Sequence, residues 1–396
     1  MNVFDGGPRQ DDRPARHGES AAAFYARVAG GYWDEVRACI EDWFSRLPSD
    51  AKADVRSRLR SDDNRQFSSA YFELYLHEVL LCSGFRVTCH PDVPGTSRRP
   101  DFLAEDGEAS FYVEARVVSG SDAGERASRR LARLYDSLDA MDLPNFFLNV
   151  EVFAQGPKDP PTKPLRAAIT SWLDSLAPDA VSAGIGDRGF MGLPVKEWAC
   201  DGWRLVFRPI PKKPEARGPG RGMRALGAYG PGNASWVDDA TPLRAALSDK
   251  GKAYGVLDKP FLVAVNTSRL TDDDVDVMNA LYGTEAIQLG TTSAGELVTR
   301  SVRAPDGYWF AGRDWLHRGV SAVLVARQLS PVTPTRSTPT MWAHPDPVHA
   351  APRLPICRHV SVRMDELRVE DPAASPAELL GLPTPWPTAE AFPKFA

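Results

Sequence analysis

Residues 67–118 read FSSAYFELYLHEVLLCSGFRVTCHPDVPGTSRRPDFLAEDGEASFYVEARVV, and this stretch decides the fold. The apolar run that opens it has the length and spacing of a helix. Three short stretches rich in β-branched and aromatic residues follow, bounded by Pro and Gly, and they predict strands at 85–93, 101–104 and 111–118. The turn residues 105–107, Glu-Asp-Gly, predict a hairpin between the last two strands.

Acidic side chains recur along this stretch. Side chains alternate in the last strand, so Glu114 and Arg116 share one face. The hairpin would bring Asp101 beside Glu114. With Glu73 from the preceding helix, these carboxylates suit a hard divalent cation, Mg²⁺ or Mn²⁺. Two simpler interpretations stay open: Glu73 as a solvated helix acid, and Asp101 as the start of a turn.

The layout resembles the restriction-endonuclease-like superfamily, the PD-(D/E)XK nucleases. That family has a helix with an acid, a Pro-Asp at a strand start, and an acid, any residue and a lysine on the next strand. The matching residues here are Glu73, Pro100-Asp101 and Glu114-Ala115-Arg116, within residues 66–156. The resemblance implies that Asp101 and Glu114 hold the metal, with Glu73 helping directly or through water. One departure is that Arg116 stands where the family has lysine.

A replacement for that lysine is available further along the chain. Some superfamily members are similar in placing an essential lysine, or a polar residue with a tyrosine, on a helix beside the site. Lys250, Lys252 and Tyr254 precede a buried strand at 260–265. The resemblance makes Lys252 the catalytic candidate, and a plain surface lysine is the alternative.

Basic residues supply candidates for phosphate contacts. Arg98 and Arg99 lie next to the proposed metal site. A predicted helix at 121–141 carries an arginine stripe that includes Arg126 and Arg130. The segment 204–224 is the most basic in the chain, and its Pro and Gly content predicts a mobile loop. The nucleic-acid candidates in that loop are Lys212, Lys213, Arg217 and Arg221. In each case a solvated surface charge is the alternative.

Composition limits the class of protein. The chain has 396 residues and a net charge of −5, so any basic surface must be local. It has no apolar run of the roughly 20 residues that span a bilayer, and its first 20 residues lack the apolar core of a signal peptide. We therefore expect a cytoplasmic protein without a membrane partner. The five cysteines include no CxxC pair, which argues against a zinc ribbon or a disulfide framework.

The expected fold is α/β, with a mixed central sheet flanked by helices and a restriction-endonuclease-like core with extra helical and strand elements. The expected order is a disordered 1–18, a helical prefix 19–60, a nuclease-like core 61–156, a sheet extension or second lobe 157–345 with the basic loop 204–224, and a Pro-rich wrap 346–396.

The expected function is metal-dependent cleavage of DNA phosphodiester bonds, with a role in restriction or defence. The alternatives are a nuclease-fold module that binds nucleic acid but has lost catalysis, and a protein-interaction module in which the acids are structural. The choice between DNA and RNA, the recognition sequence and the oligomeric state stay open at this point.

Overall fold

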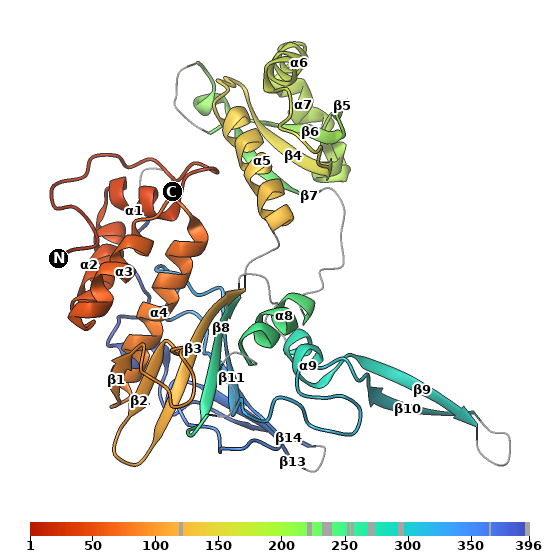
Figure 1. Ribbon diagram of the computed structural model, residues 1–396. Helices are drawn as coiled ribbons and strands as arrows, with labels where there is room; N and C mark the ends of the chain where they lie inside the picture. The colour runs from red at the N-terminus through yellow and green to blue at the C-terminus, as the bar shows by residue number, and fades with distance from the viewer. Residues whose placement is uncertain are drawn as a thin grey trace. The chain divides into compact units, whose positions relative to one another are not determined.

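The computed structural model describes residues 1–118, 122–219, 224–231, 240–251, 254, 257–267, 274–291, 297–363 and 366–392. The chain forms two compact units (Figure 1). Unit 1 comprises Met1–Pro14, Ser20–Ser119 and Asp238–Ala396, and unit 2 comprises Ala15–Glu19 and Gly120–Val237. Unit 2 is thus mainly an insertion in the sequence of unit 1.

Unit 1 begins with a group of helices. They are α1 (Ala21–Arg27), α2 (Gly31–Ser45), α3 (Ser49–Leu59) and α4 (Asn64–Cys82). Two of them start at side-chain caps: Ser20 accepts from the backbone N–H of Ala23, and Asp63 accepts from that of Arg65. From Ala70 to Leu80 every residue of α4 is buried, so this helix lies in the interior.

An eight-stranded mixed sheet forms the centre of unit 1. In spatial order its strands are β1 (Arg86–Cys89), β2 (Phe102–Glu105), β3 (Ser110–Val118), β8 (Phe261–Thr267), β11 (Ala322–Arg327), β12 (Thr340–Ala343), β13 (Arg358–Arg363) and β14 (Glu366–Glu370). The first three form an antiparallel meander, and β3, β8 and β11 are parallel. Strand β8 is buried along its whole length, as expected of a parallel strand covered on both faces.

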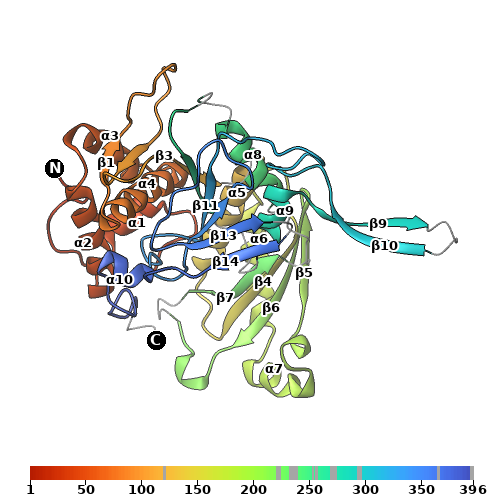
Figure 2. The ribbon, with the colours of Figure 1, turned by 90° about the horizontal axis from the view of Figure 1, so that it is seen from below.

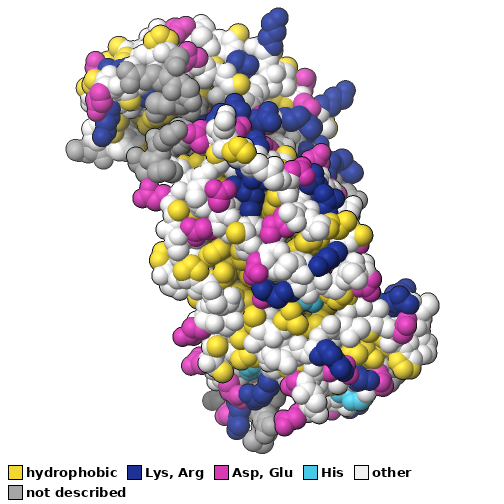
Figure 3. Space-filling view, turned by 90° about the vertical axis from the view of Figure 1, so that its left-hand side faces the viewer, with side chains coloured by type: hydrophobic (Ala, Val, Ile, Leu, Met, Phe, Trp, Pro, Cys, Tyr) yellow, Lys and Arg dark blue, Asp and Glu magenta, His cyan; other side chains and the backbone are white. Residues whose placement is uncertain are grey.

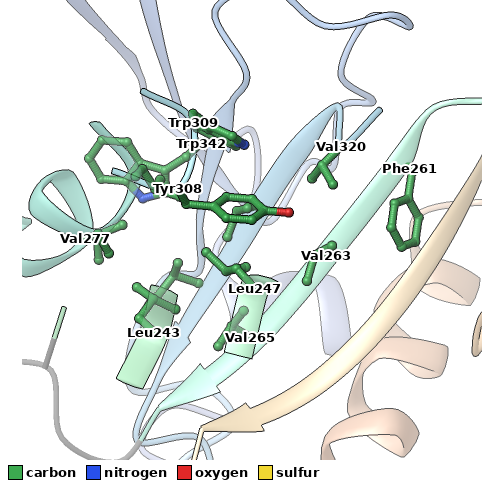
Figure 4. Packing of buried hydrophobic residues seen from close by; sticks show 14 of the residues in the cluster. Leu243, Leu247, Phe261, Val263, Val265, Val277, Tyr308, Trp309, Val320 and Trp342 are labelled. Atoms are coloured by element: carbon green, nitrogen blue, oxygen red, sulfur yellow. The ribbon is translucent and has the colours of Figure 1, made fainter. Parts of the chain in front are cut away.

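The two faces of this sheet are covered by different helices. On one face, Phe102 of β2 lies 6.0 Å from His77 of α4, measured between ring centroids. The other face packs against α8 (Ala240–Gly251) and α9 (Val275–Tyr282). Figure 4 shows Val263 and Val265 of β8 in this second layer, beside Leu247 of α8. The parallel part of the sheet is therefore the middle layer of a helix–sheet–helix sandwich.

Two further features belong to unit 1. The hairpin of β9 (Glu285–Thr291) and β10 (Leu297–Arg303) extends away from the sheet (Figure 1, Figure 2). The segment after α10 (Pro376–Leu380) returns to the N-terminal helices, where the indole Nε1 of Trp33 donates to the carbonyl of Ala391 at 3.0 Å. No helix among the described residues is both long and apolar enough to span a membrane.

Unit 2 has its own sheet and core. Its strands, in spatial order, are β5 (Lys196–Cys200), β6 (Trp203–Pro211), β4 (Phe146–Ala154) and β7 (Leu226–Pro231). Its helices are α5 (Asp122–Asp139), α6 (Thr162–Asp174) and α7 (Pro178–Gly184), with short 3₁₀ turns η1 (Gly186–Gly192) and η2 (Pro214–Ala216). Leu138, Leu148, Ile169 and Phe207 belong to one buried cluster.

The α/β class and the mixed sheet are as expected, but the expected core 61–156 is divided between the two units. The strand expected at 145–152 is β4, which pairs with β6 and β7 in unit 2. The strand beside β3 is instead β8, from much later in the chain. Both strands are apolar and follow helices, so the local pattern could not tell which one pairs with β3.

Two other expectations also differ from the structure. Residues 1–18 were expected to be disordered, but they have a defined structure. Val3 and Phe4 are buried, and their backbone N–H groups donate to Glu41 at 3.1 and 2.7 Å. The expected mobile loop 204–224 is largely strand β6 and η2 in its described part. The region 157–345 was expected to be either a second lobe or an extension of the sheet, and it is both. Its early part lies in unit 2, and its later part extends the sheet of unit 1.

Candidate functional site

The hairpin of β2 and β3 brings together Asp101 and Glu114. Phe102 pairs with Val113 in the antiparallel register, so the next position along the two strands, away from the hairpin turn, sets Asp101 opposite Glu114. Glu114 is buried, and the Oδ2 atom of Asp101 accepts from the backbone N–H of Ala115 at 2.7 Å. Local turn chemistry is sufficient to produce this juxtaposition, as the sequence predicted.

Tyr254, which follows α8, contacts the same pair of carboxylates. Its buried hydroxyl donates to Oε2 of Glu114 at 2.5 Å and lies 3.3 Å from the carbonyl of Arg99. Burial raises the pKa of Tyr254, and its hydrogen bond to Glu114 raises it further. The phenol therefore stays protonated and acts as a donor that orients Glu114. Tyr254 was not among the residues predicted for the site. Its position between a helix and a buried strand was the feature of the sequence that could have indicated it.

Glu73 has a different environment. Its carboxylate accepts from both terminal nitrogens of Arg58 of α3, at 2.7 and 2.5 Å, and from Ser69 Oγ at 3.2 Å. Helix α4 covers the face of the sheet that carries Phe102 and its partner Val113, whereas Glu114 points to the opposite face. Glu73 is therefore held by a helix–helix ion pair rather than placed beside Glu114.

This ion pair predicts a structural role for Glu73. Replacing Glu73 with Gln should lower the free energy of unfolding by about 2 kcal/mol, less than the about 3–5 kcal/mol of a fully buried pair, because Asp54 still pairs with Arg58 at 2.7 Å. Urea unfolding measures the loss, and calorimetry with Mn²⁺ should show unchanged metal binding. If the variant lost metal binding but kept its stability, Glu73 would be a metal ligand and not a structural residue.

The donor set suits one kind of divalent cation site. Among the described residues no group of three or more His, Cys, Asp and Glu side chains could hold a metal ion. Asp101 Oδ2 accepts from the N–H of Ala115 and Glu114 Oε2 accepts from the hydroxyl of Tyr254, and each oxygen of a carboxylate can take part in more than one such contact. Mg²⁺ commonly binds through one or two carboxylates, with water and substrate phosphate completing its shell. The residues fit that mode and not a cage made entirely of protein ligands.

Arg116 lies on the same strand face as Glu114, two residues further along β3, and it is half-buried opposite Val265 of β8. Its guanidinium keeps its positive charge at any usable pH, so it can attract a phosphate but cannot act as a base. Of the other predicted site residues, Lys252 and Arg221 lie outside the described residues.

The loop before β2 places two arginines near the carboxylates. Arg98 is exposed, and its positive charge opposes the rise in the pKa of Tyr254. The guanidinium of Arg99 pairs with Asp92 at 2.7 Å, and both side chains are exposed. Both arginines remain candidates for phosphate contacts.

The basic residues predicted in unit 2 do not form one group. Arg126 and Lys213 are exposed, and Arg130 is half-buried on α5. Lys212 is buried and donates to the carbonyl of Leu143 at 2.8 Å. Arg217 donates to the carbonyl of Lys212 at 3.0 Å and to Asp179 at 2.7 Å. Lys212 and Arg217 therefore stabilise unit 2, contrary to their expected role as mobile phosphate contacts.

On the face drawn in Figure 3, the Lys and Arg side chains among the described residues are interspersed with Asp and Glu. Comparisons of the chain with protein-family models, with curated proteins and with solved structures find no match. The assignment of a function therefore depends on the chemistry of the residues around Glu114.

Proposed function

We propose that unit 1 is a metal-dependent nuclease that hydrolyses phosphodiester bonds, with DNA as the expected substrate. The observation that carries this proposal is the placement of Asp101, directly before β2, opposite Glu114 of the paired strand β3, with Arg116 on the same face as Glu114. This combines carboxylates that suit Mg²⁺ or Mn²⁺ with a fixed cation that suits a phosphate.

The order of elements gives a second line of support. In unit 1, α4, β1, β2, β3, α8 and β8 follow one another as helix, three strands, helix and strand. Strand β8 lies parallel to β3. This is the order on which the resemblance to the restriction-endonuclease-like superfamily was based, with α8 and β8 in place of the segments first expected and with unit 2 inserted before α8.

The chain's own residues have separable roles in this proposal. Asp101 and Glu114 hold the cation, Tyr254 orients the Glu114 carboxylate, and the N–H of Ala115 orients that of Asp101. A bound Mg²⁺ supplies a more acidic water and neutralises negative charge on the phosphate. Arg116 adds positive charge on the same strand face, where charge develops during hydrolysis.

A nucleic-acid-binding module without catalysis is the second candidate. It is favoured by arginine in place of the family lysine and by the engagement of Glu73 with Arg58. In this case the protein would bind nucleic acid without cleaving it. If the acids serve only a protein-interaction module, the protein would respond to neither metal nor nucleic acid.

One assay separates these functions. The protein is incubated with plasmid, linear duplex and single-stranded DNA in Mg²⁺, Mn²⁺ or EDTA, and the products are resolved by size. The nuclease proposal expects cleavage with Mg²⁺ or Mn²⁺ and none with EDTA. Binding to DNA without cleavage under any condition would select the binding module.

Arg116 gives a sharper test of the same choice. Arg116→Lys should keep or raise cleavage, because it preserves the positive charge at this position and restores the residue type expected there. Arg116→Ala should lower kcat by about 100-fold, the order expected for a lost electrostatic contact, with little change in DNA affinity. If wild type cleaved no substrate but Arg116→Lys cleaved DNA with Mg²⁺, the wild-type protein would be a nuclease-fold module that has lost catalysis.

A further inference from the structure

A short N-terminal segment belongs to unit 2 although its neighbours in sequence do not. Ala15–Glu19 is part of unit 2, whereas Met1–Pro14 and the chain from Ser20 belong to unit 1. The segment, here called the strap, therefore leaves unit 1 and returns to it within a few residues. Such an excursion requires specific contacts to hold it.

Backbone groups of the strap are bound by side chains of unit 2. The two carboxylate oxygens of Asp136, on α5, accept from the successive N–H groups of His17 and Gly18, at 2.7 and 2.8 Å. Arg224 donates to the carbonyl of Ala15. The strap backbone is a turn here, closed by the Glu19 N–H, which donates to the carbonyl of Arg16 at 3.2 Å, so the Asp136 carboxylate recognises two consecutive amides that this turn presents.

The imidazole of His17 is recognised as well. Its Nε2 lies 3.0 Å from Oδ2 of Asp139, and both side chains are largely buried. The ring centroid lies 5.2 Å from that of Tyr135 and 4.9 Å from that of Tyr229, the latter edge-on. Asp139 is fixed in turn, because its Oδ1 accepts from the N–H of Leu226 at the start of β7 at 2.9 Å.

Gly18 makes the close approach possible. A Cβ atom at this position would lie 2.9 Å from Oδ2 of Asp136, closer than side-chain carbons normally come to an oxygen. The oxygen could not move away without losing its hydrogen bond to the Gly18 N–H. Unit 2 therefore recognises three features of the strap: its backbone N–H groups, the His17 ring and the absence of a side chain at Gly18.

We propose that α5 and β7 form a peptide-binding site in unit 2, and that the strap is its built-in ligand. The ligand class is a short peptide that presents an imidazole side chain followed by glycine in a turn. The strap is releasable, because Arg16 and Gly18 are exposed and its backbone is held by side-chain hydrogen bonds rather than by pairing in a sheet, as in segments that open before the core unfolds. The proposal is independent of the nuclease function.

The test uses full-length protein and a fluorescent peptide of residues 12–21. Gly18→Ala should displace the strap, so the peptide should bind this variant at least about tenfold more tightly than wild type, by anisotropy. Gly6→Ala is the matched control, because its Cβ would meet nothing within 4 Å. Adding Asp136→Ala to the Gly18→Ala variant should abolish peptide binding.

Limited trypsin digestion reports strap release directly, through cleavage of the Arg16–His17 bond. Gly18→Ala should be cleaved several-fold faster there than wild type or Gly6→Ala. Equal peptide binding by all three proteins, binding that survives Asp136→Ala, or unchanged protection of this bond in Gly18→Ala would each overturn the proposal.

Discussion

Glutamine in place of Glu114 is expected to abolish metal-dependent cleavage and to weaken Mn²⁺ binding by at least about 100-fold. The substitution preserves volume, and its carbonyl oxygen can still accept from Tyr254, so the fold should survive. It removes one of two anionic ligands. Loss of a residue that only orients a ligand costs about 10–100-fold in metal affinity, so loss of the ligand itself must cost more.

Matched variants place this effect at the site. Asp101→Asn should behave like Glu114→Gln, and Tyr254→Phe should weaken Mn²⁺ binding by about 10–100-fold because it removes the donor that orients Glu114. Glu108→Gln, on the exposed turn of the same hairpin, should change nothing. Calorimetry with Mn²⁺ and cleavage assays measure these effects. If both Asp101→Asn and Glu114→Gln still bound Mn²⁺ as wild type does, the assignment of these two residues as metal ligands would be wrong.

Acidification is expected to destabilise the protein through His77. This residue is buried on α4, and its Nδ1 has no hydrogen-bond partner among the described atoms. Burial lowers its pKa from 6.5 to about 4, and the positive charge of Arg46 contributes in the same direction. In the unfolded chain the imidazole takes up a proton near pH 6.5, before the folded protein does. The free energy of unfolding should therefore fall by about 3 kcal/mol between pH 6.5 and pH 4 through this group alone.

Urea unfolding at pH 7 and pH 4.5 measures this loss. Burial also lowers the pKa of His344 and His359, so the wild-type change contains their contributions too. The difference between wild type and His77→Leu isolates His77, because leucine is apolar and does not titrate. The variant should lose less stability on acidification than wild type. The same pH dependence in both proteins would show that His77 is not buried in its neutral form.

The sequence by itself determined the local part of the candidate site. Asp101 and Glu114 are joined by a short hairpin, and the two-residue period of a strand sets which side chains share a face. Turn chemistry and alternation act over a few residues, so they can be predicted without the rest of the chain. The juxtaposition of Asp101 and Glu114, and the placement of Arg116 on the same strand face as Glu114, follow from them.

Tertiary structure alone decided which distant groups meet these residues. Glu73 was placed in the site because it is an acid on the preceding helix, yet Arg58 on α3 and the opposite sheet face place it elsewhere. Likewise β8, and not β4, lies beside β3, and Tyr254, which follows unit 2 in sequence, donates to Glu114. Such contacts depend on packing and on charge pairing between segments far apart in sequence. Local hydrophobic patterns determine whether a segment forms a helix or a strand, but not which partner it packs against.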